Sequence, residues 1–261
     1  MLKLENVSKT FNAGTVNETT ALDRLNLSLE KGEFVTVIGG NGSGKSTMLN
    51  TVAGIFFVDR GKVTIDGSDV TALPDFKRAN YLGRVFQDPM MGTAADMSIE
   101  ENLALAIRRG NRRGLGWGVP KSERSQYREA LALLDLGLED RLTAKVGLLS
   151  GGQRQAVTLL MATIKRPKLL LLDEHTAALD PKTAAKVSEL SEMLVKRDKL
   201  TTLMVTHNMK DAIRYGDRLI MMDEGKIVFE ASGEDKRDLT VRDIIEKFSS
   251  VREDYGGMLL S

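Results

Sequence analysis

The stretch GEFVTVIGGNGSGKSTMLNTVAGI, residues 32–55, decides the fold of this chain. Its mostly apolar, β-branched residues 34–38 predict a buried strand, and a helix is expected to begin near Lys45. The glycine-rich turn between them fits the spacing G-x-x-x-x-G-K-[ST]. In such a turn the backbone N–H groups point inward around phosphate oxygens, and the following helix adds the positive end of its dipole. The stretch therefore predicts a phosphate-binding loop, the alternative being a flexible glycine loop.

The side chains of this loop have expected parts in nucleotide binding. Lys45 is expected to reach the β and γ phosphates of a nucleoside triphosphate, and the Ser46 hydroxyl to hold Mg²⁺. The expected nucleotide contacts in the loop are Gly39, Asn41, Gly42, Ser43, Gly44, Lys45, Ser46 and Thr47. The loop leaves the reaction open, because small GTPases, small-molecule kinases, helicases and motors all share it.

A second apolar run, in RPKLLLLDEHTAALDP at residues 166–181, ends in the acids Asp173 and Glu174. Consecutive leucines are typical of a strand buried on both faces of a parallel sheet, and ligands bind at the carboxyl ends of such strands. Asp173 is therefore expected to hold Mg²⁺ through water, and Glu174 to polarise the attacking water as a general base. The alternative is that the acidic pair caps a helix beginning near Thr176.

The chain has two histidines, and each follows the end of an expected strand. His175 comes directly after Glu174, and His207 follows the strand in KLTTLMVTHNM, residues 199–209. Taken alone, either histidine would be structural. Because the sheet already carries a nucleotide, His207 becomes a candidate γ-phosphate sensor that also orients Glu174, whereas His175 is assigned no role.

Composition excludes several classes of protein. The 261 residues include 37 Lys and Arg against 36 Asp and Glu, which gives no support to a nucleic-acid binder that relies on bulk positive charge. The absence of cysteine excludes disulfides and thiolate metal sites. No apolar run approaches the roughly 20 residues of a membrane helix, and the first residues alternate like a strand rather than a signal peptide. A soluble chain with one domain, or one domain with a lobe, is expected.

LSGGQ, residues 149–153, precedes a helical run and has no side chain suited to acid–base or metal chemistry. A serine and two glycines ahead of a helix form a second anion site, the alternative being a simple helix cap at Ser150. Together with the phosphate loop, the strand ending in Asp-Glu and the strand-end histidine, this pentapeptide makes the whole chain resemble the nucleotide-binding subunit of ABC transporters. LSGGQ is the signature of that family.

The resemblance implies roles that the residues alone do not. It implies a homodimer in which two copies pair head to tail around ATP, the signature of one copy contacting the γ-phosphate held by the other. The residues that would act in this way are Ser150, Gly151, Gly152 and Gln153. Three further positions match the family: Gln87 in RVFQDP as a link between Mg²⁺ and the transmembrane partner, Asp180 as a subunit contact, and Phe11 as the aromatic that stacks on adenine. His175 departs from the family, which commonly has proline there.

The implied fold class is α/β, a P-loop NTPase with an ABC-type core. Such a core has a mostly parallel sheet flanked by helices, an N-terminal antiparallel β part and an inserted α-helical subdomain. The expected organisation is one ABC ATPase domain over residues 1–261, with the nucleotide-binding core at 1–87 and 166–230, the helical subdomain at 88–165, and a closing helix and tail at 231–261. Leucine periodicity predicts helices within 98–109 and 122–138, and DRLIMMDEGKIVF, residues 217–229, predicts a hairpin that turns at 223–225.

The implied function is ATP hydrolysis that powers solute transport by a transmembrane permease, with ATP and Mg²⁺ as cofactors. The chain is expected as a peripheral subunit on the cytoplasmic face of the cell membrane, with no nucleic-acid partner. DEHTAALDP is similar to a bacterial importer subgroup, which implies uptake of a small organic solute such as an amino acid and an extracytoplasmic substrate-binding protein.

Three alternatives stay open at this point. One is an exporter-type ABC ATPase, and another is a non-transport ABC ATPase that acts on a cytosolic or cell-division assembly. A small-molecule kinase would share the phosphate loop but leave LSGGQ unexplained. The basic segment 108–120, with Trp117, is either a solvated loop or a contact to the membrane partner or lipid headgroups.

Overall fold

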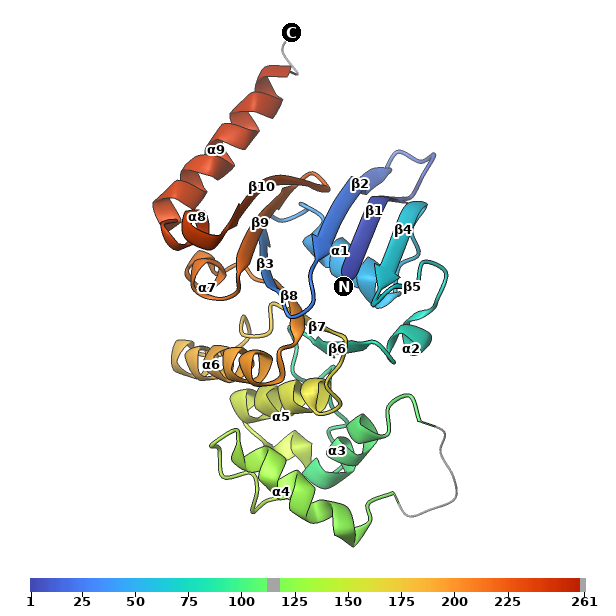
Figure 1. Cartoon of the computed structure of the whole chain (residues 1–261), viewed down its shortest axis with the longest axis vertical. Helices are drawn as coiled ribbons and strands as arrows, with labels where there is room; N and C mark the ends of the chain where they lie inside the picture. Colours follow the sequence, from blue (N-terminus) through green and yellow to red (C-terminus); the bar gives the residue numbers. More distant parts are fainter. Residues whose placement is uncertain (112–117, 259–261) are drawn as a thin grey trace. The chain divides into compact units, whose positions relative to one another are not determined.

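The computed structural model describes residues 1–111 and 118–258, with side chains as far as residue 249 (Figure 1). The chain divides into two compact units, Met1–Ala72 with Leu203–Ser261 and Leu73–Thr202. This division does not test the expected boundaries at residues 87, 165 and 230, which stay predictions. None of the described helices is long and apolar enough to cross a membrane.

The first unit contains the phosphate loop and the strands around it. Before the loop and just after it the elements are β1 (Leu2–Phe11), β2 (Thr19–Leu29), β3 (Phe34–Gly39), α1 (Lys45–Ala53), β4 (Arg60–Ile65) and β5 (Ser68–Asp69). The chain returns to this unit within β8 (Thr201–Val205) and continues with α7 (Met209–Arg214), β9 (Arg218–Asp223), β10 (Lys226–Ser232), α8 (Gly233–Arg237) and α9 (Val241–Met258).

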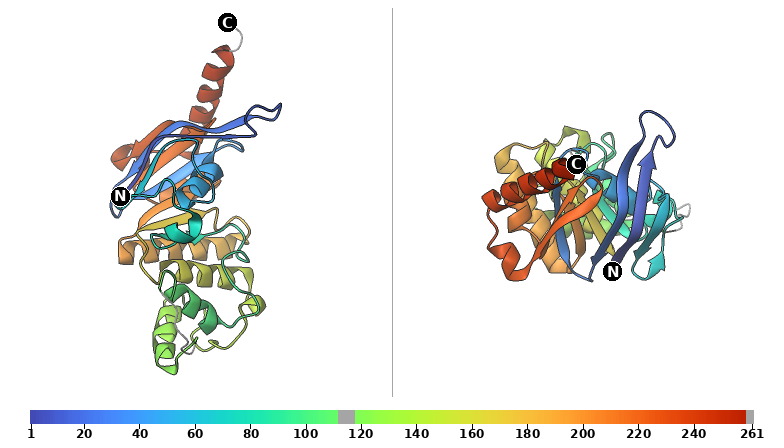
Figure 2. Two further views of the ribbon diagram at one scale, coloured as in Figure 1. Left: turned by 90° about the vertical axis from the view of Figure 1, so that its right-hand side faces the viewer. Right: turned by 90° about the horizontal axis from the view of Figure 1, so that it is seen from above.

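An antiparallel sheet of order β2-β1-β4-β5 forms the N-terminal part of this unit. In β1 the buried Leu2 and Leu4 alternate with the exposed Lys3 and Glu5, as expected of a strand with one face on the core. Figure 2 shows β1 and β2 running side by side, in the register that pairs Leu2 with Leu29. The antiparallel N-terminal part expected from the sequence is confirmed.

The second set of strands in this unit positions the loop. Every residue of β3 is buried, and β3 pairs in parallel with β9, Val37 opposite Ile220. The hairpin of β9 and β10 turns at residues 224–225, where the sequence predicted it. Packed around Ile38, near the end of β3, is an apolar cluster that helps to fix where the phosphate loop begins. It contains Ala212, Leu219, Met221 and Ile244.

The second unit combines helices with two parallel strands. Its elements are α2 (Asp75–Arg78), β6 (Leu82–Val85), α3 (Ile99–Ile107), η1 (Lys121–Glu123), α4 (Arg124–Ala132), η2 (Val146–Leu148), α5 (Gly151–Thr163), β7 (Leu169–Asp173) and α6 (Pro181–Asp198). β6 and β7 pair in parallel, with Val85 opposite Leu172. The helices α5 and α6 lie side by side (Figures 1 and 2). The α/β class is therefore confirmed, with helices where leucine periodicity predicted them.

One expectation about this unit is wrong. No helix begins near Thr176, because the chain turns through residues 174–179 and α6 begins at Pro181. Asp180 caps α6 by accepting a hydrogen bond from the Thr183 N–H at 3.1 Å, and proline is favoured at the first helical position. Asp173 and Glu174 therefore do not cap a helix there.

Candidate functional site

The phosphate loop joins β3 to α1 through a glycine that no other residue can replace without strain. Gly44 has a φ of 98°, and a Cβ on it would lie 2.4 Å from the carbonyl oxygen of Ala21. As the N-cap of α1 it supplies no capping side chain. The first N–H groups of a helix have no acceptor within the helix, which makes a helix start a common place for an anion to bind.

Lys45 holds the only positive charge in this loop. Its side chain is buried, and Nζ donates to the carbonyl oxygens of Gly39 and Gly40, both at 2.8 Å, and to Ser43 Oγ at 3.2 Å. The ammonium group is therefore fixed at the loop among acceptors that phosphate oxygens could replace. Asn41, Gly42 and Ser46 are exposed, and Thr47 is half-buried.

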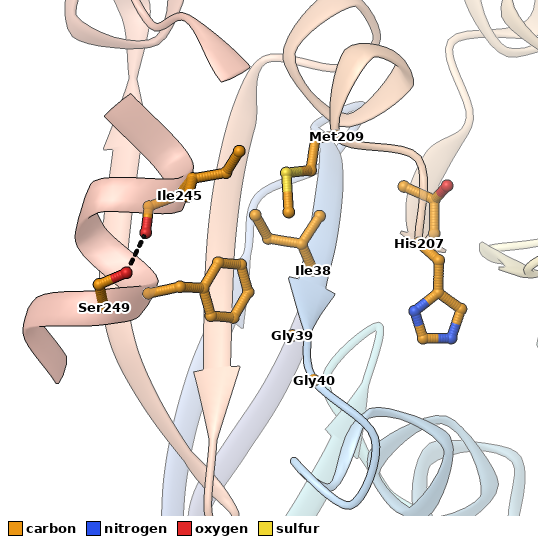
Figure 3. Close-up of a pocket in the computed structure, with 9 residues that line it drawn as sticks. Ile38, Gly39, Gly40, His207, Met209, Ile245 and Ser249 are labelled. Carbon is orange, nitrogen blue, oxygen red and sulfur yellow. Dashed lines mark hydrogen bonds between the residues drawn. The ribbon is translucent and has the colours of Figure 1, made fainter. Parts of the chain in front are cut away.

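His207 lies beside the phosphate loop in the same unit. The N–H of Thr206, just after β8, donates to the carbonyl of Val37 at 3.1 Å, which places the end of β8 next to β3. A pocket of about 320 Å³ is lined by Gly39, Gly40 and His207, together with side chains of α9. Figure 3 shows His207 on one side of the two glycines and Ile245 on the other. An exposed imidazole is thus held at the edge of the loop.

Phe11, the expected adenine-stacking residue, lies at the end of β1. Its ring packs edge-to-face on Phe56, with the ring centres 5.2 Å apart. The Lys9 ammonium lies 5.6 Å from the centre of the same ring. Phe56, which sequence reasoning missed, follows α1 and so connects the Phe11 ring to the far end of the phosphate-loop helix.

In the second unit, Asp173 is held by an arginine that the sequence did not reveal. Arg84 Nη2 lies 2.7 Å from Asp173 Oδ2, and both side chains are largely buried, at 13% and 16% exposure. The guanidinium also lies 4.6 Å from the ring centre of Phe86. Because β6 and β7 are neighbouring parallel strands, Asp173 at the end of β7 and Gln87 just after β6 lie at the same edge of the sheet. No local pattern connects residues 84 and 173, so only the fold could show the pair.

Glu174 has an unusual backbone conformation. Its φ is 45°, in the left-handed region that costs an L-residue roughly 1–2 kcal/mol. Strained backbone of this kind is concentrated at functional sites, where the surrounding structure holds it in place. The side chain of the expected general base therefore starts from a sharp turn after β7.

His175 has a structural role, which sequence reasoning left open. It is 3% exposed, and its Nε2 lies 2.8 Å from Ser191 Oγ on α6. Burial lowers the pKa of this imidazole to about 4, so the ring is neutral near neutral pH. His175 thus connects the turn after Glu174 to α6.

The signature segment forms the start of α5. Ser150 Oγ accepts from the Gln153 N–H, and Gln153 Oε1 accepts from the Ser150 N–H, both at 3.3 Å. Ser150 therefore caps the helix, as the alternative interpretation of this segment expected. The cap does not exclude anion binding, because the serine hydroxyl keeps a proton to donate. A Cβ on Gly152 would lie 2.0 Å from Thr183 Cγ2, so any other residue there would force the Thr183 side chain or the helices α5 and α6 to shift.

Asp180 lies near the signature segment. It caps α6, and hydrogen bonds from Thr183 hold the pKa of its carboxyl below the ordinary value. A Cβ on Gly151 would lie 3.4 Å from the neighbouring Leu179. The structure therefore brings the signature and the expected subunit-contact aspartate together within one chain.

A second pocket, of about 440 Å³, lies wholly within the second unit. Its lining is both cationic and apolar: Arg84, Arg108 and Arg109 supply charge, and Phe86, Met91, Leu105 and Met161 supply apolar surface. Met91 is 68% exposed. Trp117, a candidate membrane contact in the sequence, lies outside the described residues.

The expected site residues thus form two groups. The first unit contains Phe11, Gly39, Asn41, Gly42, Ser43, Gly44, Lys45, Ser46, Thr47 and His207. The second unit contains Gln87, Ser150, Gly151, Gly152, Gln153, Asp173, Glu174 and Asp180. Their geometry within each unit is described above, and their catalytic and binding roles stay predictions.

Comparison with known proteins supplies the context for this geometry. Residues 22–177 match the family model described as ABC transporter. The chain is 44% identical to the tyrosine transport ATP-binding protein of Clostridioides difficile, over 95% of this chain and 98% of that protein. It is 33% identical to the spermidine/putrescine import ATP-binding protein PotA of Haemophilus influenzae, over 89% of this chain and 58% of that protein. Its structure is similar to that of the ATP-binding cassette MJ0796 in a dimeric post-hydrolysis state bound to ADP and phosphate. The TM-score is 0.75 and the sequence identity 34%, over 89% of this chain and 98% of that chain.

Proposed function

Because the chain belongs to the ABC transporter family, we propose that it is the ATP-binding subunit of an importer for a small organic solute, an amino acid such as tyrosine. As an importer-like member of this family, the chain is an ATP hydrolase. The proposed solute follows from the similarity to the tyrosine transport protein, because no described side chain has an assigned contact with cargo. Uptake would also need a permease and an extracytoplasmic substrate-binding protein.

ATP binds, in this proposal, on the phosphate loop. Lys45 contacts the β and γ phosphates, Phe11 stacks on the adenine, and the N–H groups at the start of α1 bind phosphate oxygens. Hydroxyl and carboxylate oxygens are the donors that Mg²⁺ prefers, so Ser46 and Asp173 are the residues that would hold this ion.

Hydrolysis requires a positioned water molecule. Glu174 accepts its proton as the general base, and general-base assistance contributes typically about 10² to 10⁴ in rate. His207 donates to the γ-phosphate. Mg²⁺ neutralises developing phosphate charge when it is bound.

Two copies pair head to tail around ATP, so each nucleotide is bound by residues of both copies. Lys45 binds it from one copy, and Ser150 to Gln153 contact its γ-phosphate from the other. The similarity to a dimeric cassette supports this arrangement. The short capped start of α5 also supports it, because its exposed serine hydroxyl and glycine backbone can reach an anion on another chain.

The permease docks, in this proposal, at the 440 Å³ pocket beside Arg84 and Phe86. A lining that combines apolar and cationic side chains suits an amphipathic helix at the cytoplasmic end of a membrane protein. Docking there would place the subunit peripherally at the cytoplasmic face and next to Gln87. This contact would transmit ATP-driven movement to the permease.

The observation that carries the proposal is the presence in one chain of two candidate anion sites, the Lys45 loop and the Ser150 helix start. The test is uptake of radiolabelled tyrosine by cells that make the chain with its membrane partner, compared with the Lys45→Ala variant. ATP-dependent uptake that the variant loses supports an importer. ATP hydrolysis without uptake of any amino acid would favour the exporter or non-transport alternatives, and phosphorylation of an acceptor would favour a kinase.

A further inference from the structure

Gln155 is a buried amide that contacts two separated segments of the second unit. It lies in α5, five residues beyond Ser150, and is 0% exposed. Its Nε2 donates to the carbonyl oxygen of Phe86 at 3.0 Å and to that of His175 at 2.6 Å. A primary amide has two N–H donors, so both are used here.

The orientation of this amide is dictated by its neighbours. Backbone carbonyls only accept hydrogen bonds, so the NH₂ group of Gln155 must face them and its oxygen must point away. That oxygen, Oε1, has no hydrogen-bond partner in the part of the chain that the structure describes. A buried amide with an unpaired oxygen is costly, which suggests that the two donated bonds determine the choice of glutamine at this position.

Both carbonyls belong to segments with proposed catalytic functions. The Phe86 carbonyl is part of the peptide that leads into Gln87. The His175 carbonyl follows Glu174, whose φ of 45° makes its backbone depend on the surroundings. Gln155 therefore bonds to the segment that follows β6 and to the segment that follows β7.

The helix that carries Gln155 also begins with the signature. An α-helix rises about 1.5 Å per residue, so Ser150 and Gln155 are about 7.5 Å apart along one rigid element. Any displacement of the start of α5 therefore moves Gln155 as well. Its two hydrogen bonds pass this displacement to Gln87 and Glu174.

We propose that Gln155 is a positioning residue for ATP hydrolysis. Through its two hydrogen bonds, the position of the signature helix determines where the segments of Gln87 and Glu174 lie. This inference rests on the proposed function. Gln155 does not contact nucleotide in this account, so its loss should slow the chemical step without weakening ATP binding at the Lys45 loop.

The test is steady-state ATP hydrolysis by Gln155→Met, which keeps the length of the side chain and removes both donors. We expect kcat to fall by at least about tenfold, with nucleotide affinity unchanged in a titration with a fluorescent ATP analogue. The matched control is Thr163→Val. Thr163 is also buried in α5, and its hydroxyl donates to the carbonyl of Leu159 in the same helix, so its loss tests a general effect on the helix.

A second variant keeps the test decisive if Gln155→Met folds poorly. In Gln155→Glu, a carboxylate facing two carbonyls cannot donate, whereas the protonated acid can donate one bond. The kcat of this variant relative to wild type should therefore rise as the pH is lowered from 8 to 6. A ratio that does not change with pH, or a kcat in Gln155→Met equal to that of Thr163→Val, would overturn the inference. A wild-type chain without ATPase activity would instead overturn the proposed function.

Discussion

Acidification should destabilise this protein through His175. The pKa of this buried imidazole is lowered from 6.5 to about 4, so the folded chain keeps the ring neutral where the unfolded chain protonates it. The unfolded state then binds more protons, so the free energy of unfolding falls as the pH falls from about 6.5 to about 4. Integrated from pH 7.5 to pH 5.0, the loss from this one group is about 2 kcal/mol of unfolding free energy.

The assay is urea unfolding, followed by circular dichroism, of wild type and His175→Gln at both pH values. Glutamine cannot titrate and can still bond to Ser191, so this variant should lose about 2 kcal/mol less than wild type between pH 7.5 and pH 5.0. The matched control is His207→Gln, which removes an exposed histidine and should keep the loss caused by His175. Equal pH dependence in His175→Gln and wild type would refute the assignment of a buried, neutral His175.

Three predictions concern the proposed ATPase cycle. Glu174→Gln should reduce turnover by about 10² to 10⁴ while ATP still binds; turnover near that of wild type would exclude Glu174 as the base. Lys45→Ala should weaken ATP binding about 10- to 100-fold, because a charge-assisted hydrogen bond contributes roughly 1.5–3 kcal/mol; an unchanged ATP titration would contradict its phosphate contact. Ser150→Arg and Lys45→Ala chains, each inactive alone, should regain up to one working site per heterodimer when mixed. Absence of recovery at every mixing ratio, with both chains folded and dimeric, would contradict action of Ser150 on the partner's nucleotide.

Local sequence patterns predicted the elements that surround the phosphate loop. Residues 34–38 indicated a buried strand because they are mostly apolar and β-branched, and β3 ends one residue later. The glycine at position 44 and the lysine after it marked the start of α1. The signal at Asp223 to Gly225 marked the hairpin because turn residues separate two apolar runs.

Three of the features that the sequence did not reveal have the same physical cause, which is that contacts between distant residues leave no local pattern. The ion pair of Arg84 with Asp173 and the hydrogen bonds of Gln155 join residues far apart in the chain. The burial of His175 also depends on the packing of α6 against its turn. The helix expected near Thr176 was wrong for a local reason, since Asp180 and the proline after it are a stronger start signal.

The central claim is that ATP joins two copies of this chain through the signature of each. Light scattering on Glu174→Gln, with ATP and Mg²⁺ and again with ADP, tests it most directly, because slow hydrolysis preserves the bound state. The account predicts the mass of a dimer with ATP and of a monomer with ADP. A monomer under both conditions would contradict the head-to-tail pairing around ATP.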